Sequence, residues 1–175
     1  MEIAQAIAQV IRDIPDFPKP GILFKDITPL FYDQQLCTRI ADEFILRLEQ
    51  KPDAVVGIES RGFLFGFLVA NKLDIPFVLV RKAGKLPYKT LRMDYALEYG
   101  TATLEMHEDA LKKGWKVIVH DDLLATGGTA EATANLVKKS GASVAGFNFV
   151  ISLDSLNGLS KLTKHSTHIT CLTHF

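Results

Sequence analysis

Residues 121–129 have the composition of an anion-binding loop, because two acids and then hydroxyl groups and glycines follow an apolar run. Glycines let the backbone approach a phosphate, threonine hydroxyls donate to it, and the N-terminus of a following helix supplies free N–H groups. The segment lacks a Gly-Lys-Ser/Thr ending and a dinucleotide fingerprint, so it is not a Walker P-loop or a dinucleotide-binding turn. The phosphate cradle that we predict consists of Ala125, Thr126, Gly127, Gly128 and Thr129.

Asp121 and Asp122 stand just before this cradle and are expected to face hydroxyl groups or a metal. A sugar that carries a phosphate would satisfy both the acids and the cradle. An ordinary strand-turn-helix connection with two solvated acids is the alternative, and it would carry equal weight if only the two glycines were present.

Residues 81–92 carry five cations and no acid in a chain whose 20 Lys and Arg balance 20 Asp and Glu. A charge run is more often a solvated face than a site. This run, however, begins after an apolar stretch and contains Gly84 and Pro87, which are typical of a loop. Cations at such a place would bind a polyanion and stabilise the charge that develops on a leaving group.

The elements that must position these residues are short apolar runs separated by helical patterns. We expect strands at 54–58, 76–80 and 115–119 and within 143–153, and helices at 3–13, about 36–50, 63–73 and 128–139, the last ended by Gly141. Residues 94–98 and 101–105 alternate as a projecting hairpin does, and residues 16–29 are expected to be irregular. The pattern predicts an α/β fold with a parallel sheet buried on both faces.

In such a sheet, ligands bind beyond the carboxyl ends of the strands. Three polar segments follow predicted strands, and we expect them to meet there: residues 59–62, 81–85 and 121–129.

Length, charge and cysteine content limit the number of domains and the classes of protein to which the chain can belong. A chain of 175 residues fits one domain spanning 1–175, and a formal charge of zero argues against a nucleic-acid binder. No apolar run reaches the roughly 18 residues that a membrane helix needs, and the N-terminus has no secretory-signal pattern. Two cysteines fit a reducing compartment, so we expect a cytoplasmic protein without membrane association.

Residues 119–129 resemble the phosphoribosyl-pyrophosphate motif of the type I phosphoribosyltransferases, and their sequence is most similar to that of the members that use adenine. Further motifs agree in order along the chain, at 15–29, 60–66, 81–87 and 97–100. The resemblance implies a mainly parallel central sheet flanked by helices, a projecting hairpin with a flexible loop, and a small N-terminal hood.

The implied reaction transfers the phosphoribosyl group from 5-phosphoribosyl 1-diphosphate to adenine and gives AMP and pyrophosphate, a step of purine salvage. The resemblance also implies a homodimer and Mg²⁺ as cofactor. Since Mg²⁺ commonly binds through substrate phosphates with few protein ligands, no metal-ligating residue is assigned.

At the leaving-group end, the resemblance makes Arg61, Arg81, Lys82 and Lys85 the pyrophosphate contacts. It also implies a cis peptide in the loop that begins Glu59-Ser60, with Ser60 and nearby N–H groups facing pyrophosphate; a plain β–α turn is the alternative. The acids described above would then bind the ribose hydroxyls and favour a cationic transition state. The cradle would bind the 5′-phosphate.

At the base end, Phe24 is expected to stack on adenine, with the backbone of Leu23 and Lys25 reading its edge. Glu98 is the candidate for proton transfer at the imidazole nitrogen, and Tyr99 for closure over the site. An exposed strand carboxylate is the alternative for Glu98.

Several points stay open at this stage. His120 stands where the family is expected to have an apolar residue, so it is either a hydrogen-bonded core histidine or a residue that alters the environment of Asp121. Rival functions are transfer to another purine base, a regulator that binds the sugar diphosphate without turnover, and a plain phosphosugar-binding domain.

Overall fold

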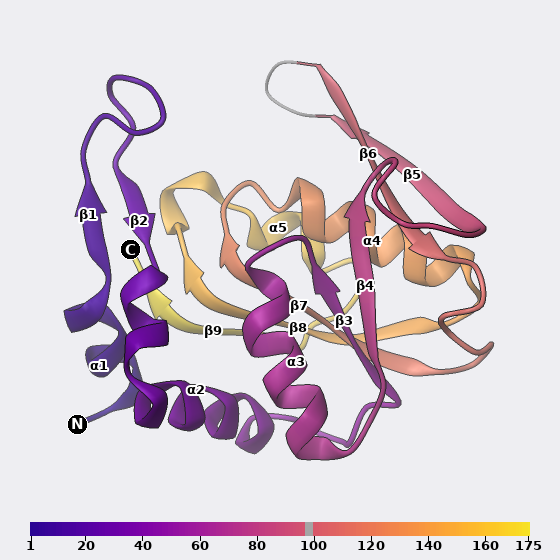
Figure 1. The fold of residues 1–175 in the computed structure, drawn as a ribbon, viewed down its shortest axis with the longest axis horizontal. Coiled ribbons are helices and arrows are strands. Elements are labelled where there is room, and N and C mark those ends of the chain that lie inside the picture. The colour runs from indigo at the N-terminus through magenta and orange to yellow at the C-terminus, as the bar shows by residue number, and fades with distance from the viewer. Residues whose placement is uncertain (97–99) are drawn as a thin grey trace.

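The computed structural model describes residues 1–96 and 100–175. Its centre is a seven-stranded sheet in the order β5-β6-β4-β3-β7-β8-β9, and a separate two-stranded sheet is formed by β1 and β2 (Figure 1). The strands are β1 Arg12–Ile14, β2 Phe24–Asp26, β3 Ala54–Ile58, β4 Phe77–Lys82, β5 Thr90–Ala96, β6 Thr101–His107, β7 Lys116–Leu124, β8 Ser143–Ser152 and β9 Ile169–His174.

The strands from β4 across to β9 pair in parallel, and only β5 and β6 join the sheet antiparallel. The expectation of a mainly parallel sheet is therefore confirmed. Its cause is visible in β3, where all five residues are buried because helices cover both faces of the sheet.

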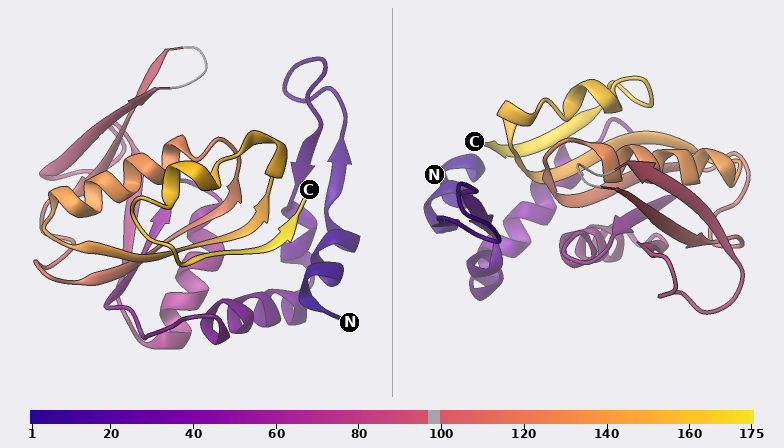
Figure 2. Two further views of the ribbon diagram at one scale, coloured as in Figure 1. Left: turned by 180° about the vertical axis from the view of Figure 1, so that it is seen from behind. Right: turned by 90° about the horizontal axis from the view of Figure 1, so that it is seen from above.

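Helices α1, α2 and α3 pack on one face of the sheet, and α4 with the short α5 packs on the other (Figure 2). The helices are α1 Ile3–Val10, α2 Gln34–Leu46, α3 Gly62–Leu73, α4 Gly128–Lys139 and α5 Leu159–Leu162, with 3₁₀ turns at Thr28–Tyr32 and Asp154–Leu156. In the described part of the chain no helix is long and apolar enough to cross a membrane.

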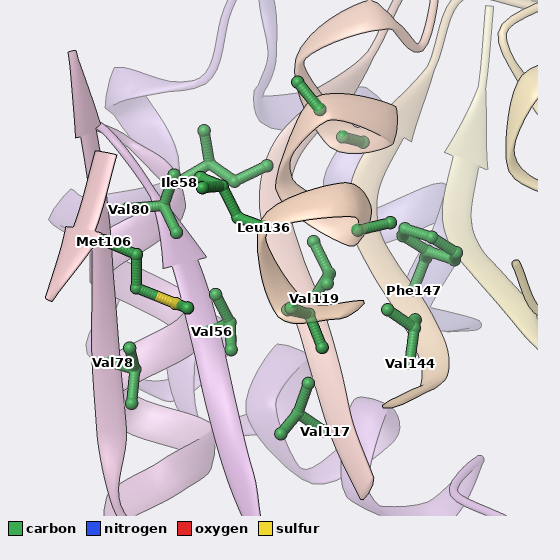
Figure 3. Packing of buried hydrophobic residues seen from close by; sticks show 14 of the residues in the cluster. Val56, Ile58, Val78, Val80, Met106, Val117, Val119, Leu136, Val144 and Phe147 are labelled. Atoms are coloured by element: carbon green, nitrogen blue, oxygen red, sulfur yellow. The ribbon is translucent and has the colours of Figure 1, made fainter. Parts of the chain in front are cut away.

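The core on the α4 side interlocks β-branched side chains of the central strands with the helix (Figure 3). Val56, Val80 and Val119 are completely buried there, and Leu136 of α4 packs over them. Burying a side chain of this size contributes about 1.5–3 kcal/mol, so these strands form a rigid base for the loops at their ends.

The N-terminal helix is shorter than the sequence pattern predicts. It ends at Val10, because Arg12–Ile14 pairs with Phe24–Asp26 as an antiparallel ribbon. This pairing also gives a strand to part of the segment 16–29 that was expected to be irregular. Its partners are far apart in sequence, so local periodicity does not reveal it.

Strand β7 is longer than predicted. It pairs with β8 as far as Leu124 opposite Ser152, so Asp121 and Asp122 belong to the strand rather than to the turn after it. The helix predicted to run to residue 50 ends at Leu46. Helix α4 has the predicted bounds, and Gly141 beyond it has a φ of +87° and returns its N–H to the last turn.

Two hairpins rise on the side where the parallel strands end (Figure 1). One is β1–β2 near the N-terminus. The other is β5–β6, whose antiparallel register from Thr90 opposite His107 to Ala96 opposite Thr101 confirms the predicted hairpin in its described part. The carboxyl ends of the parallel strands therefore lie between the β1–β2 hairpin and the β5–β6 hairpin.

Candidate active site

A cavity of about 420 Å³ lies at the carboxyl ends of β3 and β7. It brings together three segments that follow strands in the sequence, as the parallel sheet predicts. The residues that line it are Glu59, Ser60, Arg61, Lys82, Tyr95, Leu104, Asp121, Asp122, Leu123, Leu124, Ala125, Thr126, Gly127, Gly128, Thr129, Ala130 and Phe149.

The floor of the cavity is the loop 125–129 and the first turn of α4. Gly127 has a φ of +76°, a conformation that side chains rarely adopt, and the helix begins at Gly128. The free N–H groups of this turn and the hydroxyls of Thr126 and Thr129 are the donors that a phosphate requires. All five residues predicted to form the cradle therefore line the cavity.

The start of α3 approaches the acids of β7 very closely, and only glycine permits this. A Cβ atom on Gly62 would stand 2.9 Å from Asp121 Oδ1 and 2.9 Å from the His120 carbonyl oxygen. The preceding Glu59–Ser60 peptide is cis, as the family resemblance implies. Ser60 is exposed and lines the cavity together with the two acids.

The two acids contact each other directly. Asp121 Oδ1 accepts the Asp122 N–H at 2.8 Å, and burial together with the Asp122 charge raises the pKa of Asp121. Asp122 forms an ion pair with Arg61, whose Nε lies 2.9 Å from Asp122 Oδ2. A cation or several hydroxyl donors in the cavity would stabilise the doubly charged form of this pair.

Glu59 joins the cavity to the cations at the end of β4 and in the loop that follows it. Its carboxylate accepts Lys85 Nζ at 2.6 Å and the Lys82 N–H at 2.9 Å, and Arg81 Nε lies 3.4 Å away. Burial alone would raise the pKa of Glu59, but these donors outweigh it and lower the pKa. Glu59 lines the cavity as predicted, yet its negative charge is directed at the loop cations.

The predicted base-binding segment lies on β2, outside the lining of the cavity. The Phe24 ring packs edge-on against Phe17 at 5.1 Å, and the Arg61 guanidinium stands 5.4 Å from the Phe24 ring. Arg61 therefore spans from the acid pair to this aromatic ring. Leu23 is half exposed, whereas the Lys25 side chain is enclosed by Asp13 at 2.6 Å and by the Phe175 ring.

The structure thus brings together most residues that the sequence singled out. Glu98 and Tyr99 lie outside the described residues, so their predicted roles stay predictions. Sequence reasoning missed Tyr95 and Phe149, which line the cavity from β5 and β8. Their only signal is position: Tyr95 is in the hairpin and Phe149 is opposite Asp121 in the neighbouring strand.

His120, left open by the sequence, is a core residue. It is completely buried and packs edge-on against Phe44 at 5.1 Å. Neither ring nitrogen has a hydrogen-bond partner among residues 1–96 and 100–175, so the hydrogen bond expected for a core histidine is not formed there. Burial lowers the pKa of His120 to about 3. The neutral ring therefore fills the space under α2 and does not enter the cavity.

Comparison with known proteins agrees with this geometry. Residues 31–173 match the family model described as a phosphoribosyl transferase domain. The adenine phosphoribosyltransferase of Cytophaga hutchinsonii is 51% identical over 174 residues, which cover 99% of this chain and 96% of the relative.

Solved structures agree as well. The adenine phosphoribosyltransferase of Thermoanaerobacter pseudethanolicus superposes with a TM-score of 0.93 at 46% identity, covering 98% of this chain and 99% of that one. The enzyme of Saccharomyces cerevisiae, solved with adenine and an imino-altritol bisphosphate, gives 0.92 at 42% identity, covering 97% and 98%.

Proposed function

The chain belongs to the adenine phosphoribosyltransferase family, and from this premise we propose how its residues transfer the phosphoribosyl group from 5-phosphoribosyl 1-diphosphate to adenine. The products are AMP and pyrophosphate, so the reaction serves purine salvage. The observation that carries the proposal is the cavity in which an acid pair, a phosphate cradle and the edge of a basic loop meet. Transfer to another purine and a regulator without turnover are not favoured, because the relatives are named for adenine.

The cradle at the start of α4 would bind the 5′-phosphate, and the loop cations would bind the diphosphate. The N-terminus of α4 favours an anion such as the 5′-phosphate. Lys82 lines the cavity, and Arg81 and Lys85 stand beside it around Glu59. Negative charge grows on the diphosphate as the glycosidic bond breaks, so these cations would stabilise the transition state more than the ground state.

The acid pair would act on the ribose. Asp121 and Asp122 line the cavity. There they would accept hydrogen bonds from the ribose hydroxyls, and their charge would stabilise an oxocarbenium-like sugar. Arg61 holds Asp122 in place through its ion pair and reaches toward Phe24. The base would stack on Phe24, where the backbone of Leu23 and Lys25 can read its edge. Glu98 is proposed to transfer the proton at the imidazole nitrogen, with Tyr99 assisting closure, on the strength of the sequence alone.

Mg²⁺ is the proposed cofactor, and the donors available fit it. Asp121 and Asp122 offer hard carboxylate oxygens at the cavity wall. Within residues 1–96 and 100–175, no group of three or more His, Cys, Asp or Glu could hold a metal ion unaided. Substrate oxygens would therefore complete the coordination, as is usual for Mg²⁺. When bound, the ion supplies charge neutralisation for the diphosphate.

We further propose a homodimer built from one domain spanning 1–175. Leu64 and Phe67 of α3 and Leu79 of β4 are large apolar side chains exposed on one face, and Phe67 contacts Phe77 beside them. An exposed apolar cluster of this kind is typical of a subunit interface.

A cytoplasmic location is proposed because Cys37 and Cys171 are free thiols.

The test is a pyrophosphate-release assay with 5-phosphoribosyl 1-diphosphate and Mg²⁺, in which adenine, guanine, hypoxanthine and xanthine are presented separately. Release with adenine alone supports the proposal. Release with guanine or hypoxanthine but not adenine would overturn the substrate assignment, and release with no base would favour the regulator.

A further inference from the structure

Glu105 of β6 is a buried acid outside the cavity lining that no step of the reaction uses. It is only 1% exposed, and its neighbours Leu104 and Met106 belong to the core. A carboxylate in such a place is costly unless donors surround it. Among the described residues, the donors around it come from residues 84–92, the segment that follows the basic end of β4.

The contacts of Glu105 are mainly with backbone. The Gly84 N–H donates to Oε1 at 2.5 Å and the Lys85 N–H donates to the same oxygen at 3.2 Å. The Thr90 hydroxyl donates to Oε2 at 3.1 Å, and Arg92 Nε lies 3.3 Å from it. The single carboxylate therefore joins both ends of the loop.

The loop around Gly84 has the geometry of a backbone anion-binding site, and the anion that occupies it is the carboxylate of Glu105. Gly84 has a φ of +83°, and successive N–H groups around such a residue form a concavity that binds a negative charge. Here Glu105 fills it. Burial works to raise the pKa of Glu105, but the N–H groups and the Thr90 hydroxyl outweigh burial and lower that pKa, so the carboxylate stays ionised at neutral pH.

The backbone conformation that Glu105 stabilises at residues 84–85 also determines the positions of the Arg81 and Lys85 side chains. Lys85, whose N–H donates to Glu105, also presents its carbonyl oxygen to Arg81, whose Nη1 donates to it at 3.1 Å. The Lys85 side chain extends the other way, to Glu59 at the cavity wall. The Arg81 guanidinium and the Lys85 ammonium thus both depend on the position of the Lys85 backbone.

We propose that Glu105 is a positioning residue, which fixes the backbone of residues 84–85 so that Arg81 and Lys85 are preorganised for the diphosphate group. It sets the affinity for 5-phosphoribosyl 1-diphosphate and for pyrophosphate without touching either. The inference rests on the proposed function, because it assumes that the loop cations bind a diphosphate.

The test compares Glu105→Gln with the wild type and with Glu108→Gln, the same chemical change at an exposed site three residues further along. Binding of inorganic pyrophosphate with Mg²⁺ is measured by isothermal titration calorimetry, which needs no turnover. Because a hydrogen bond to a charged group is lost, Glu105→Gln should weaken binding about tenfold or more. In steady-state assays the KM for 5-phosphoribosyl 1-diphosphate should rise in parallel, while the KM for adenine and the Glu108→Gln values stay at the wild-type level.

Thermal unfolding of each variant separates positioning from stability. A lower melting temperature with unchanged pyrophosphate affinity would overturn the proposal and leave Glu105 a structural residue. If Glu105→Gln does not fold, Thr90→Val removes one donor and keeps the acid, and it should weaken pyrophosphate binding several-fold; wild-type affinity in that variant would count against the proposal. Failure of the wild type itself to bind pyrophosphate would instead refute the proposed function.

Discussion

The buried histidine next to the acid pair makes the stability of the protein depend on pH in a predictable way. In the folded chain the pKa of His120 is about 3, because the ring is fully buried among apolar groups. In the unfolded chain its pKa returns to about 6.5. Below that value the unfolded chain takes up a proton that the folded chain does not, so stability is complete above pH 6.5 and falls as the pH falls toward 3.

The magnitude follows from the two pKa values. Stability changes by about 1.4 kcal/mol per pH unit in this window, so lowering the pH from about 7.5 to about 5 should cost about 2 kcal/mol through His120 alone. For a domain of this size, that loss corresponds to a decrease in melting temperature of roughly 4–8 °C.

Other groups also titrate between these pH values, so the contribution of His120 is measured as the difference between the wild type and a variant without the ring. Wild type and His120→Leu are unfolded in urea at both pH values, and the loss of unfolding free energy on acidification is compared. We expect the wild type to lose about 2 kcal/mol more than the variant. At pH 7.5 the variant should be at least as stable, because leucine removes two buried nitrogens that have no hydrogen-bond partner in the described part of the chain.

Two results would refute the reasoning. Equal losses on acidification in the wild type and His120→Leu would mean that the ring is protonated in the folded protein or accessible to water. A large loss of stability in His120→Leu at pH 7.5 would mean that the ring makes a favourable polar contact under α2.

Three further predictions concern the site and use steady-state kinetics. Phe24→Leu removes the stacking surface and should raise the KM for adenine about tenfold, with the KM for 5-phosphoribosyl 1-diphosphate unchanged; an unchanged KM for adenine would place the base elsewhere. Lys85→Met removes a loop cation and should raise the KM for 5-phosphoribosyl 1-diphosphate about tenfold and weaken its dependence on salt; a wild-type value would separate the loop from the diphosphate. Glu98→Gln should lower turnover strongly while 5-phosphoribosyl 1-diphosphate still binds, and unchanged turnover would remove Glu98 from the mechanism.

The position of residues 125–129 at the cavity could be predicted from sequence because the signal is local. Hydroxyls and glycines at 125–129 stand between an apolar run and a helix, and the parallel sheet then fixes where that loop must lie. The cations of 81–85 were predictable for the same reason. Both segments carry their signal in side-chain type and spacing.

The features that were missed depend on contacts between distant parts of the chain. Arg12–Ile14 becomes a strand only because Phe24–Asp26 lies beside it, and the end of β7 is set by pairing with β8. Glu105 reads as one polar residue in an alternating strand, since its partners are mostly backbone N–H groups, which leave no trace in the sequence. The contact of Arg61 with Phe24 likewise joins two elements whose distance no local pattern specifies.

The central claim is that the cavity at the strand ends transfers phosphoribose to adenine, with the acid pair of β7 at its centre. The most direct measurement is AMP formation from adenine and 5-phosphoribosyl 1-diphosphate by the wild type and by the double variant Asp121→Asn/Asp122→Asn. The wild type should form AMP, and the folded double variant should be slower by about 100-fold or more, because two groups that stabilise the transition state lose their charge. AMP formation at the wild-type rate in the double variant would contradict the account.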